Sequence, residues 1–377
     1  MSALQTDHDR ALAALRALRG TCTAAIDALQ QPSTAEQFSI LASRPTLAVI
    51  HKDFQSLLTL IYTSTTKVTL VLRPTEPAPN AALAPIRDLG TSITSLATCA
   101  TLFHLYGTTL ASETRLLASD VIEAVRSLAM MFVEDAGGDY LVRTGAVHDM
   151  VEKARRELPA DNIAAVRKRW RADRGMLEDS LEDINAMVED AGEGEDLDAD
   201  ELDDEWDELG FGSTKKMSDD ELERTKKIQP LVRFVTLFHK RVVPDVLGSL
   251  SNPPPSTDAL NQALDILPSL SKSVVVAVEE VVAALYAPQK PAALAASIST
   301  LVETIHAVHT SVTVDMLLPP ADLERAMGAL SMDSSKGGGE KAAKDPRKWF
   351  ESCLAQIDKS AKAVGVMLQD QVNNGTS

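Results

Sequence analysis

The sequence predicts an all-α protein built of two antiparallel helical bundles. Apolar residues recur at helical spacing along most of the 377 residues, and no segment shows the apolar–polar alternation of a strand. Aromatic residues make up only 4% of the chain, which suits helices that pack closely through Ala, Leu and Val. Long amphipathic helices joined by short loops are typical of antiparallel bundles.

A highly acidic segment separates the two predicted bundles. Thirteen of the twenty residues from Glu189 to Glu208 are Asp or Glu and none is Lys or Arg; without these thirteen, the formal net charge of −17 falls to −4. Repulsion between like charges prevents such a segment from forming a core, so we expect a solvated, disordered linker. The expected division is an N-terminal bundle over 1–191, an acidic flexible linker over 192–217, and a C-terminal bundle over 218–377 with a flexible insert at 331–344.

Capping and helix-breaking residues place the helices of the first bundle. Pro45 should kink or break one of them, Gly107 should follow the end of another, and Asp161 or Asn162 should cap the last. That last helix carries an apolar seam that includes Trp170. The expected ranges are about 6–29, 33–72, a third ending near 107, then 111–136, 140–158 and 162–190.

Similar signals place the helices of the second bundle. Ser218 and Glu221 form a capping box that opens one helix, and Asp345 with Pro346 opens the last. Two more helices are expected between them, over about 260–285 and 291–317, with a short one at 321–330. The longest regular seam consists of Leu260, Leu264, Leu267, Ser271, Val274, Val278, Val281 and Leu285.

Composition argues against several classes of protein. The acidic charge gives no electrostatic reason for direct binding to nucleic acid and favours basic partner surfaces. Cys22, Cys99 and Cys353 are odd in number and far apart, which indicates a reducing compartment rather than a disulfide framework. The first ten residues show no secretory signal. Residues 89–112 are uncharged and long enough to span a bilayer, but half are Ser, Thr, Gly or His, so we expect a buried bundle helix and no membrane contact.

No cofactor, metal site or enzymatic activity is predicted. The run 203–207 matches the DDxxD of all-α isoprenoid synthases, but no second metal-binding motif accompanies it. Residues 196–201 imitate half of a calcium loop, with Glu201 where Gly is needed, which leaves only weak cation association. Glu303 and His306 form one Glu-x-x-His motif, whereas a di-iron bundle needs two. A metal-dependent all-α enzyme is therefore the least favoured hypothesis.

Two further features are open to more than one interpretation. The basic cluster from Arg167 to Arg171 suits a nuclear-import signal, a solvated helix face or a docking site for the acidic linker. Because Trp170 falls on the apolar side of that helix, we favour the solvated face. Ser218 and Ser180 each precede acidic residues and are candidate phosphosites for an acid-directed kinase. For Ser218 we favour the role of a plain N-cap.

The best candidate for partner binding lies in the acidic linker itself. Three apolar side chains there are surrounded by carboxylates, and such a segment can fold onto a partner that offers a basic, grooved surface. This pattern favours a binding protein over an enzyme. The candidate partner-binding residues are Asp203, Asp204, Glu205, Trp206, Leu209 and Phe211.

Two stretches carry a resemblance to a known family. In Val147 to Asp190, a helix is followed by LPADN (Leu158 to Asn162) and by a long helix that ends in acids. In Leu209 to Val235, LGF precedes MSDDELERTKKIQPLVRFV, an acidic segment that runs into a helix with an internal Pro230. In this order the features resemble the cyclin-D-interacting protein family (GCIP, the cyclin-D-binding protein 1-like group), while the N-terminal third is similar only in helical style.

The resemblance implies a function without catalysis. It implies a protein of two helical bundles. It also implies that this protein binds cyclin-type or other cell-cycle and transcription regulators and restrains cell-cycle progression, in nucleus and cytoplasm. The family has been described as containing a helix-loop-helix, but no basic DNA-contacting helix accompanies one here. The helical style also resembles vinculin- and talin-type bundles, so a cytoskeletal or scaffold protein is the alternative.

Overall fold

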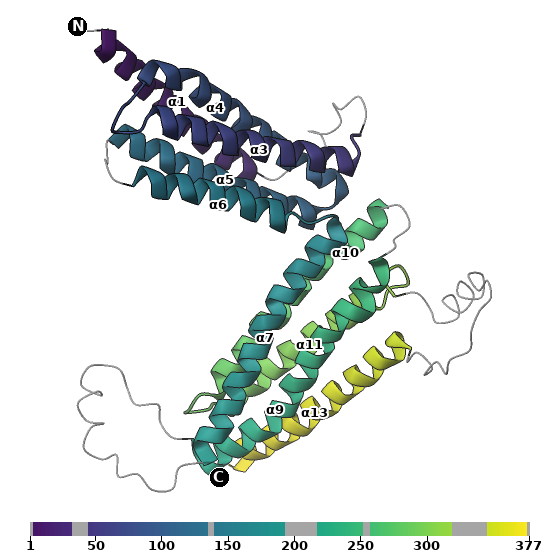
Figure 1. The fold of residues 1–377 in the computed structure, drawn as a ribbon. Coiled ribbons are helices and arrows are strands. Elements are labelled where there is room, and N and C mark those ends of the chain that lie inside the picture. Colours follow the sequence, from purple (N-terminus) through teal and green to yellow (C-terminus); the bar gives the residue numbers. More distant parts are fainter. Residues whose placement is uncertain are drawn as a thin grey trace, which may run out of the picture. The chain divides into compact units, whose positions relative to one another are not determined.

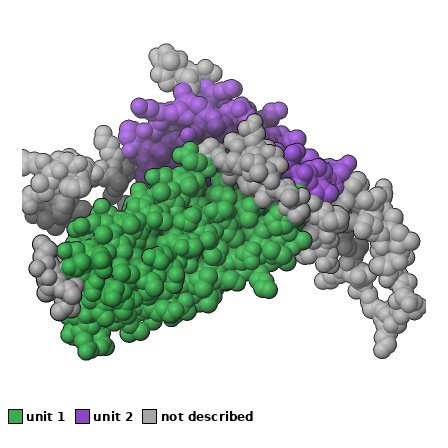
Figure 2. Space-filling model, turned by 90° about the horizontal axis from the view of Figure 1, so that it is seen from above, with its two compact units in different colours: residues 1–165 green, residues 166–377 purple. Residues whose placement is uncertain are grey.

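The chain folds into helices throughout the part that the structure describes. A computed structural model describes residues 3–31, 44–134, 139–192, 217–251, 257–318 and 345–374. Every regular element in these ranges is helical, which confirms the all-α class. Residues 1–165 form one compact unit and residues 166–377 a second (Figure 2), so the prediction of two helical bundles is also confirmed.

The first unit contains five long helices among the described residues. They are α1 (Ala3–Gln30), α3 (Leu47–Val71), α4 (Pro79–Leu102), α5 (Thr108–Glu134) and α6 (Tyr140–Glu157), with the 3-10 turn η1 (Phe103–Tyr106) after α4. Helix α1 packs against α4 and α5, and α3 packs against α4 and α6, side by side (Figure 1). Helix α3 begins just after the break expected at Pro45; the capping box predicted at 33–37 lies outside the described residues.

The core of the first unit is one apolar cluster to which all five helices contribute. Leu89, Ile93 and Leu96 of α4 are buried in it, so the uncharged stretch that starts at Leu89 supplies a helix of the bundle. Phe103 of η1 lies edge-on to Phe54 of α3, with ring centroids 5.8 Å apart. The bundle is therefore closed by ordinary burial of amphipathic helix faces.

The turn between η1 and α5 depends on Gly107. Its φ of +134° lies in a region that side chains rarely tolerate, and a Cβ there would lie 2.2 Å from Cγ of Asn162. The Asn162 side chain fills this space because its Oδ1 accepts a hydrogen bond from the Leu110 N–H at 3.0 Å. Asp161 caps the following helix by accepting from the Ala164 N–H at 2.7 Å.

The second unit also consists of long helices joined by turns. Its described elements are α7 (Asn162–Gly192), α9 (Asp219–Val242), the π-helical turn η2 (Val243–Leu247), the 3-10 turn η3 (Ser249–Ser251), α10 (Asp258–Leu285), α11 (Pro291–Val312) and α13 (Pro346–Asn374). Helix α10 packs against α11, and α13 packs against α11 and α9. All eight residues of the seam predicted in α10 are buried. Asp345 accepts from the Arg347 N–H at 3.0 Å, which confirms the predicted start of α13.

The boundary between the units lies between Ala165 and Val166, in the first turn of α7. The sequence-based division instead placed residues up to 191 with the first bundle. The difference arises because Trp170 and Leu177 on the apolar side of α7 are fully buried. Helix α7 is also hydrogen-bonded to α9 through Trp170 and to α10 through Asp173, within the second unit. The acidic residues between α7 and α9 therefore connect two helices of one unit.

Several predictions fall where the structure gives no description. The acidic linker predicted over 192–217 lies, apart from its ends, outside the described residues. The same holds for the short helix predicted at 321–330 and for the flexible insert predicted at 331–344. These three remain expectations from the sequence.

A chain of polar groups crosses the core of the second unit. His239 Nε2 lies 2.8 Å from Ser271 Oγ, and the Ser271 hydroxyl donates to Asp173 Oδ2 at 2.6 Å. Because that hydroxyl proton points to Asp173, His239 donates through Nε2–H, and its buried Nδ1 has no hydrogen-bond partner. The Trp170 indole stacks on the imidazole, with centroids 4.3 Å apart, and donates to the His239 carbonyl at 2.8 Å. These contacts join α7 to α9 and α10.

Helix α11 is the one helix in the described ranges that is long and apolar enough, by length and composition, to cross a membrane. Its buried residues recur along one side from Leu294 to Val312. His306 on its other side is about half exposed and pairs with Asp358 of α13 at 2.8 Å. This two-sided pattern is that of an amphipathic bundle helix.

Replacing Gly107 by Ala should destabilise the first unit, because the new Cβ would overlap Asn162 at a strained backbone angle. We expect a loss of about 1–3 kcal/mol in the free energy of unfolding, measured by circular dichroism in urea. Gly145→Ala in α6 is the matched control, since open space surrounds it. Removing that helical glycine should raise stability by about 0.5–1 kcal/mol. Equal effects of both changes would contradict this account of the turn.

The stability of the second unit should fall as the pH drops below about 6.5. Burial, together with the positive charge of Arg174, lowers the pKa of His239 to about 3. The ordinary histidine pKa of 6.5 applies in the unfolded chain, so between pH 6.5 and about pH 3 the unfolded chain binds a proton that the folded chain excludes. The contribution of His239 to stability is therefore complete above pH 6.5 and declines below it. At pH 5 the loss from this histidine should reach about 2 kcal/mol relative to pH 7.5.

Tryptophan fluorescence in urea measures this loss, since all three tryptophans lie in residues 166–377. His239→Gln should be less stable at pH 7.5 but should show a flatter pH dependence than the unmodified protein. His306→Gln, which removes an exposed histidine, is the control and should keep the original slope. An unchanged slope in the His239 variant would show that another group causes the pH dependence.

Candidate interaction surfaces

The partner-binding residues predicted from the sequence are not placed by the structure. Asp203, Asp204, Glu205, Trp206, Leu209 and Phe211 lie outside the described residues. The DDxxD match at 203–207 and the partial calcium-loop pattern at 196–201 lie there too. Their roles remain predictions from the sequence.

Ser218 caps α9, as the sequence predicts. Its hydroxyl accepts from the Glu221 N–H at 3.4 Å, and its backbone N–H donates to Glu221 Oε2 at 2.9 Å, which completes the capping box. The hydroxyl also lies 3.1 Å from that same Oε2, to which it donates. Ser218 and the two aspartates that follow it are exposed.

Glu221 also reaches across the bundle, in a contact that we name the Glu221–Gln289 latch. Its Oε1 accepts from the backbone N–H of Gln289 at 2.7 Å, and the Gln289 side-chain amide donates to the Glu221 carbonyl at 3.2 Å. Arg224 Nε donates to Gln289 Oε1 at 2.8 Å, and all three side chains are nearly completely buried. The latch holds the start of α9 against the turn between α10 and α11.

The charge of the Glu221 carboxylate is stabilised in place. Burial alone would raise the pKa of Glu221, but hydrogen bonds from Ser218 and Gln289 and the charge of Arg224 outweigh burial and lower that pKa. The latch is therefore formed by an ionised carboxylate at neutral pH, which makes its hydrogen bonds stronger than bonds between neutral groups.

Ser180, the second candidate phosphosite, occupies a different environment. Its side chain is only 7% exposed, in the middle of α7. A kinase needs its target hydroxyl in an accessible segment, so α7 would have to open locally before Ser180 could react. The geometry favours Ser218 over Ser180 as a place for modification.

The basic cluster of α7 lies largely on the solvent side of the helix. Trp170 is fully buried, whereas Arg169 and Arg171 are exposed. Arg167 donates from Nη2 to the Leu247 carbonyl at 2.7 Å. This placement agrees with a solvated helix face; nuclear import and docking of the acidic residues stay untested.

In the described ranges, the remaining candidate metal ligands and nucleophiles do not form a site. No group of three or more His, Cys, Asp or Glu there is placed to hold a metal ion. His306 of the single Glu-x-x-His motif pairs with Asp358 instead. The three cysteines are free and buried. Burial raises the pKa of the Cys22 and Cys99 thiols to about 12, so they stay protonated and weakly nucleophilic.

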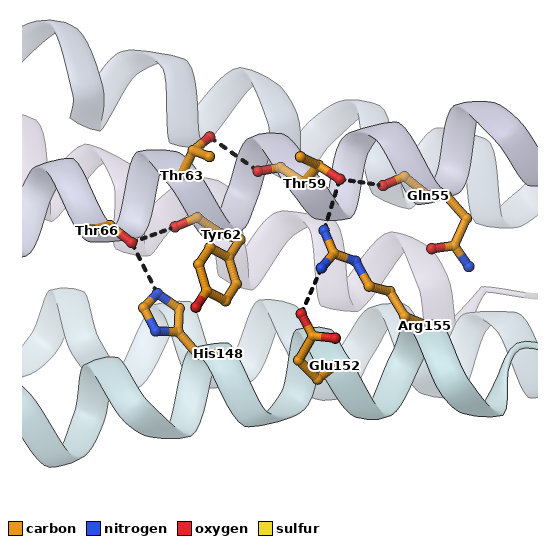
Figure 3. Close-up of polar contacts among 8 residues, drawn as sticks. All are labelled: Gln55, Thr59, Tyr62, Thr63, Thr66, His148, Glu152 and Arg155. Atoms are coloured by element: carbon orange, nitrogen blue, oxygen red, sulfur yellow. Dashed lines mark hydrogen bonds and ion pairs between the residues drawn. The ribbon is translucent and has the colours of Figure 1, made fainter.

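The structure reveals a polar surface between α3 and α6 that no sequence pattern had indicated (Figure 3). The Tyr62 ring stacks on His148, with centroids 3.8 Å apart, and His148 Nε2 lies 3.2 Å from Thr66 Oγ1. Arg155 donates to Thr59 Oγ1 at 2.7 Å. We name this surface the α3–α6 face; its residues are Gln55, Thr59, Tyr62, Thr63, Thr66, His148, Glu152 and Arg155.

The side chains of the α3–α6 face are held in place before any partner arrives. Arg155 is oriented from two sides, because it also donates to Glu152 Oε1 at 2.5 Å. About one turn further along the same two helices, the hydroxyls of Thr69 and Thr144 share a buried hydrogen bond of 2.8 Å that links α3 to α6. Tyr and Arg are enriched among residues that dominate protein-binding energy, and preorganisation lowers the entropic cost of binding. The face therefore suits contact with another protein.

A cavity of about 210 Å³ is a second candidate surface on the first unit. Apolar side chains line most of it, including Leu12 of α1, Leu72 and Pro77 after α3, and Phe132 of α5. A cavity of this kind accommodates an apolar side chain rather than a charged substrate.

These features define a class of protein: an all-α, two-bundle protein whose candidate surfaces suit contacts with other proteins. Residues 53–190 match the family described as Grap2 and cyclin-D-interacting, N-terminal, and residues 202–310 match its C-terminal counterpart. Together the matches cover most of the chain, so the chain belongs to the Grap2 and cyclin-D-interacting family, as its resemblance indicated. None of the curated proteins matches the chain.

The family regions do not coincide with the compact units. The N-terminal match ends at residue 190 and so includes most of α7, which belongs to the second unit. The α3–α6 face lies wholly within this match, and Ser218 with the Glu221–Gln289 latch lies within the C-terminal one. Each family region thus contains one of the candidate features described above.

Proposed function

We propose that this protein is a non-enzymatic adaptor that binds cyclin-type or other regulators of the cell cycle and transcription and thereby restrains cell-cycle progression, in the nucleus and the cytoplasm. The observation that carries the proposal is that both regions of the Grap2 and cyclin-D-interacting family occur in this chain. The family is named for Grap2 and D-type cyclin, so these are the first two partners to test.

The α3–α6 face supports a binding role because it offers a rigid, mixed surface. Tyr62 supplies an aromatic ring, Arg155 supplies a charge with fixed orientation, and exposed threonine hydroxyls lie beside them. Such a surface forms directional hydrogen bonds with a partner without first losing side-chain freedom. We propose it as the contact that the first unit makes with a regulator.

The acidic segment supports the same role through a different mechanism. Trp206, Leu209 and Phe211 offer apolar anchors within a field of negative charge, which favours a partner with a basic groove. We propose that these anchors insert into the partner while the carboxylates speed its approach.

Replacing Trp206, Leu209 and Phe211 together by Ala should reduce capture of the partner at least tenfold, because large apolar anchors dominate binding energy. Capture of purified D-type cyclin and of Grap2 by the full chain, measured by biolayer interferometry, tests this. The circular dichroism melt should be unchanged. Unchanged capture would remove the acidic segment from the binding site.

The same measurements separate the adaptor from a scaffold protein. Deletion of residues 192–217 should weaken capture at least tenfold, as the triple substitution does, if the acidic segment is part of the adaptor's binding site. Co-sedimentation of the full chain with cytoskeletal filaments, unaffected by that deletion, would support the vinculin-type alternative instead.

Arg155→Glu should also weaken capture, by about tenfold or more, because it reverses the charge that the α3–α6 face presents. Arg126→Glu is the matched control. Arg126 lies in the same unit and bonds a glutamate three residues earlier, as Arg155 does, but it lies on α5 outside the face. Equal binding by both variants would show that the α3–α6 face does not contact the partner.

A further inference from the structure

Ser218 combines an accessible hydroxyl with an acidic setting. It is exposed, and the three residues that follow it are Asp219, Asp220 and Glu221. A kinase with a basic substrate-binding surface would be attracted to such a sequence by charge complementarity. We propose that Ser218 is a phosphorylation site for an acid-directed serine/threonine kinase, and that its phosphorylation opens the Glu221–Gln289 latch. This inference does not depend on which partner the protein binds.

The modification is an ordinary phosphoryl transfer from ATP. Ser218 Oγ forms a bond to the γ-phosphorus as the bond between that phosphorus and the oxygen bridging to the β-phosphate breaks, and ADP leaves. The hydroxyl proton passes to the catalytic carboxylate of the kinase. The product carries a charge of about −1.5 to −2 at neutral pH where Ser218 had been uncharged.

The new charge arises beside an ionised carboxylate. Ser218 Oγ lies 3.1 Å from Glu221 Oε2 and donates its proton to it, and esterification removes that proton. The hydrogen bond is then lost and replaced by repulsion between phosphate and carboxylate. The backbone N–H groups at the start of α9 can turn to the phosphate, since helix N-termini bind anions. The cap of α9 is thereby kept, while the Glu221 side chain is displaced.

Displacement of Glu221 has an effect on the far side of the bundle. Glu221 Oε1 accepts the Gln289 N–H at 2.7 Å, and that backbone group is buried. Without this acceptor it must find water, so the turn between α10 and α11 has to loosen. Phosphorylation at the start of α9 thus changes a turn that lies about 70 residues away in the sequence.

The latch distinguishes Ser218 from a simple helix cap elsewhere in this chain. Thr257 caps α10 by accepting from the Leu260 N–H at 3.2 Å, which is the same local geometry. The third residue after Thr257 is a leucine, so no carboxylate closes a capping box there. The buried carboxylate that links Ser218 to Gln289 is therefore not required for capping, and it gives Ser218 a connection that Thr257 lacks.

The first experiment tests the modification. The full chain is incubated with a purified acid-directed serine/threonine kinase and ATP, and sites are read by mass spectrometry. Ser218 should be modified at least tenfold faster than Ser180, the buried serine that also precedes acids. A peptide of residues 212–226 checks that the kinase accepts the sequence. Three results would overturn the proposed site. The peptide could be modified while the protein is not, neither could be modified, or Ser180 could be modified as fast as Ser218.

The second experiment tests the latch, with phosphoserine introduced at position 218 during translation. Hydrogen–deuterium exchange of the peptide containing residues 285–291 should become at least tenfold faster than in the unmodified protein. Amides at 257–264, at the cap of α10, should be unaffected. In a Glu221→Gln background, where the neutral amide is not repelled, phosphoserine should change exchange at 285–291 less than threefold. No acceleration, or the same acceleration in the Glu221→Gln background, would overturn the link to the latch.

Discussion

The apolar side of α7 is the constraint on which the second unit depends. Trp170, Leu177 and Ile184 are spaced seven residues apart and are fully buried. Side chains of this size are removed from water only where they pack against other helices, and α9 and α10 supply that surface. Chain segments on both sides of the acidic residues are thereby drawn into one bundle. A partner held by those acidic residues would be held by the second unit.

Buried polar contacts give the second unit its register. Apolar helix faces tolerate sliding, because burial of area is not directional. The bonds from Trp170 to the His239 carbonyl and from Ser271 to Asp173 form in one alignment of α7, α9 and α10. Loss of that alignment would leave buried donors and acceptors unpaired, at a cost larger than the gain from each bond. The latch from Glu221 to Gln289 acts in the same way at another position.

The sequence was sufficient wherever the cause is local or periodic. The cap at Ser218, the start of α13 and the buried seam of α10 each follow from residues close together in the chain. The α3–α6 face was missed because Tyr62 and His148 meet only once the register of two distant helices is fixed. Ser271 was counted as one position of an apolar seam for the same reason. The predicted domain boundary differed from the observed one because the acidic charge indicates which residues are solvated. It does not indicate which helices pack against the helices on either side.

The connection from α7 to α9 within one unit has a consequence for the integrity of the chain. A proteolytic cut between Gly192 and Met217 would not liberate either compact unit, because the cut ends belong to neighbouring helices of the second unit. The two fragments would stay associated through the stacked Trp170 and His239 and the surfaces around them. The same position would accept an inserted domain or new chain termini, so the acidic region could be exchanged without dismantling the scaffold that carries it.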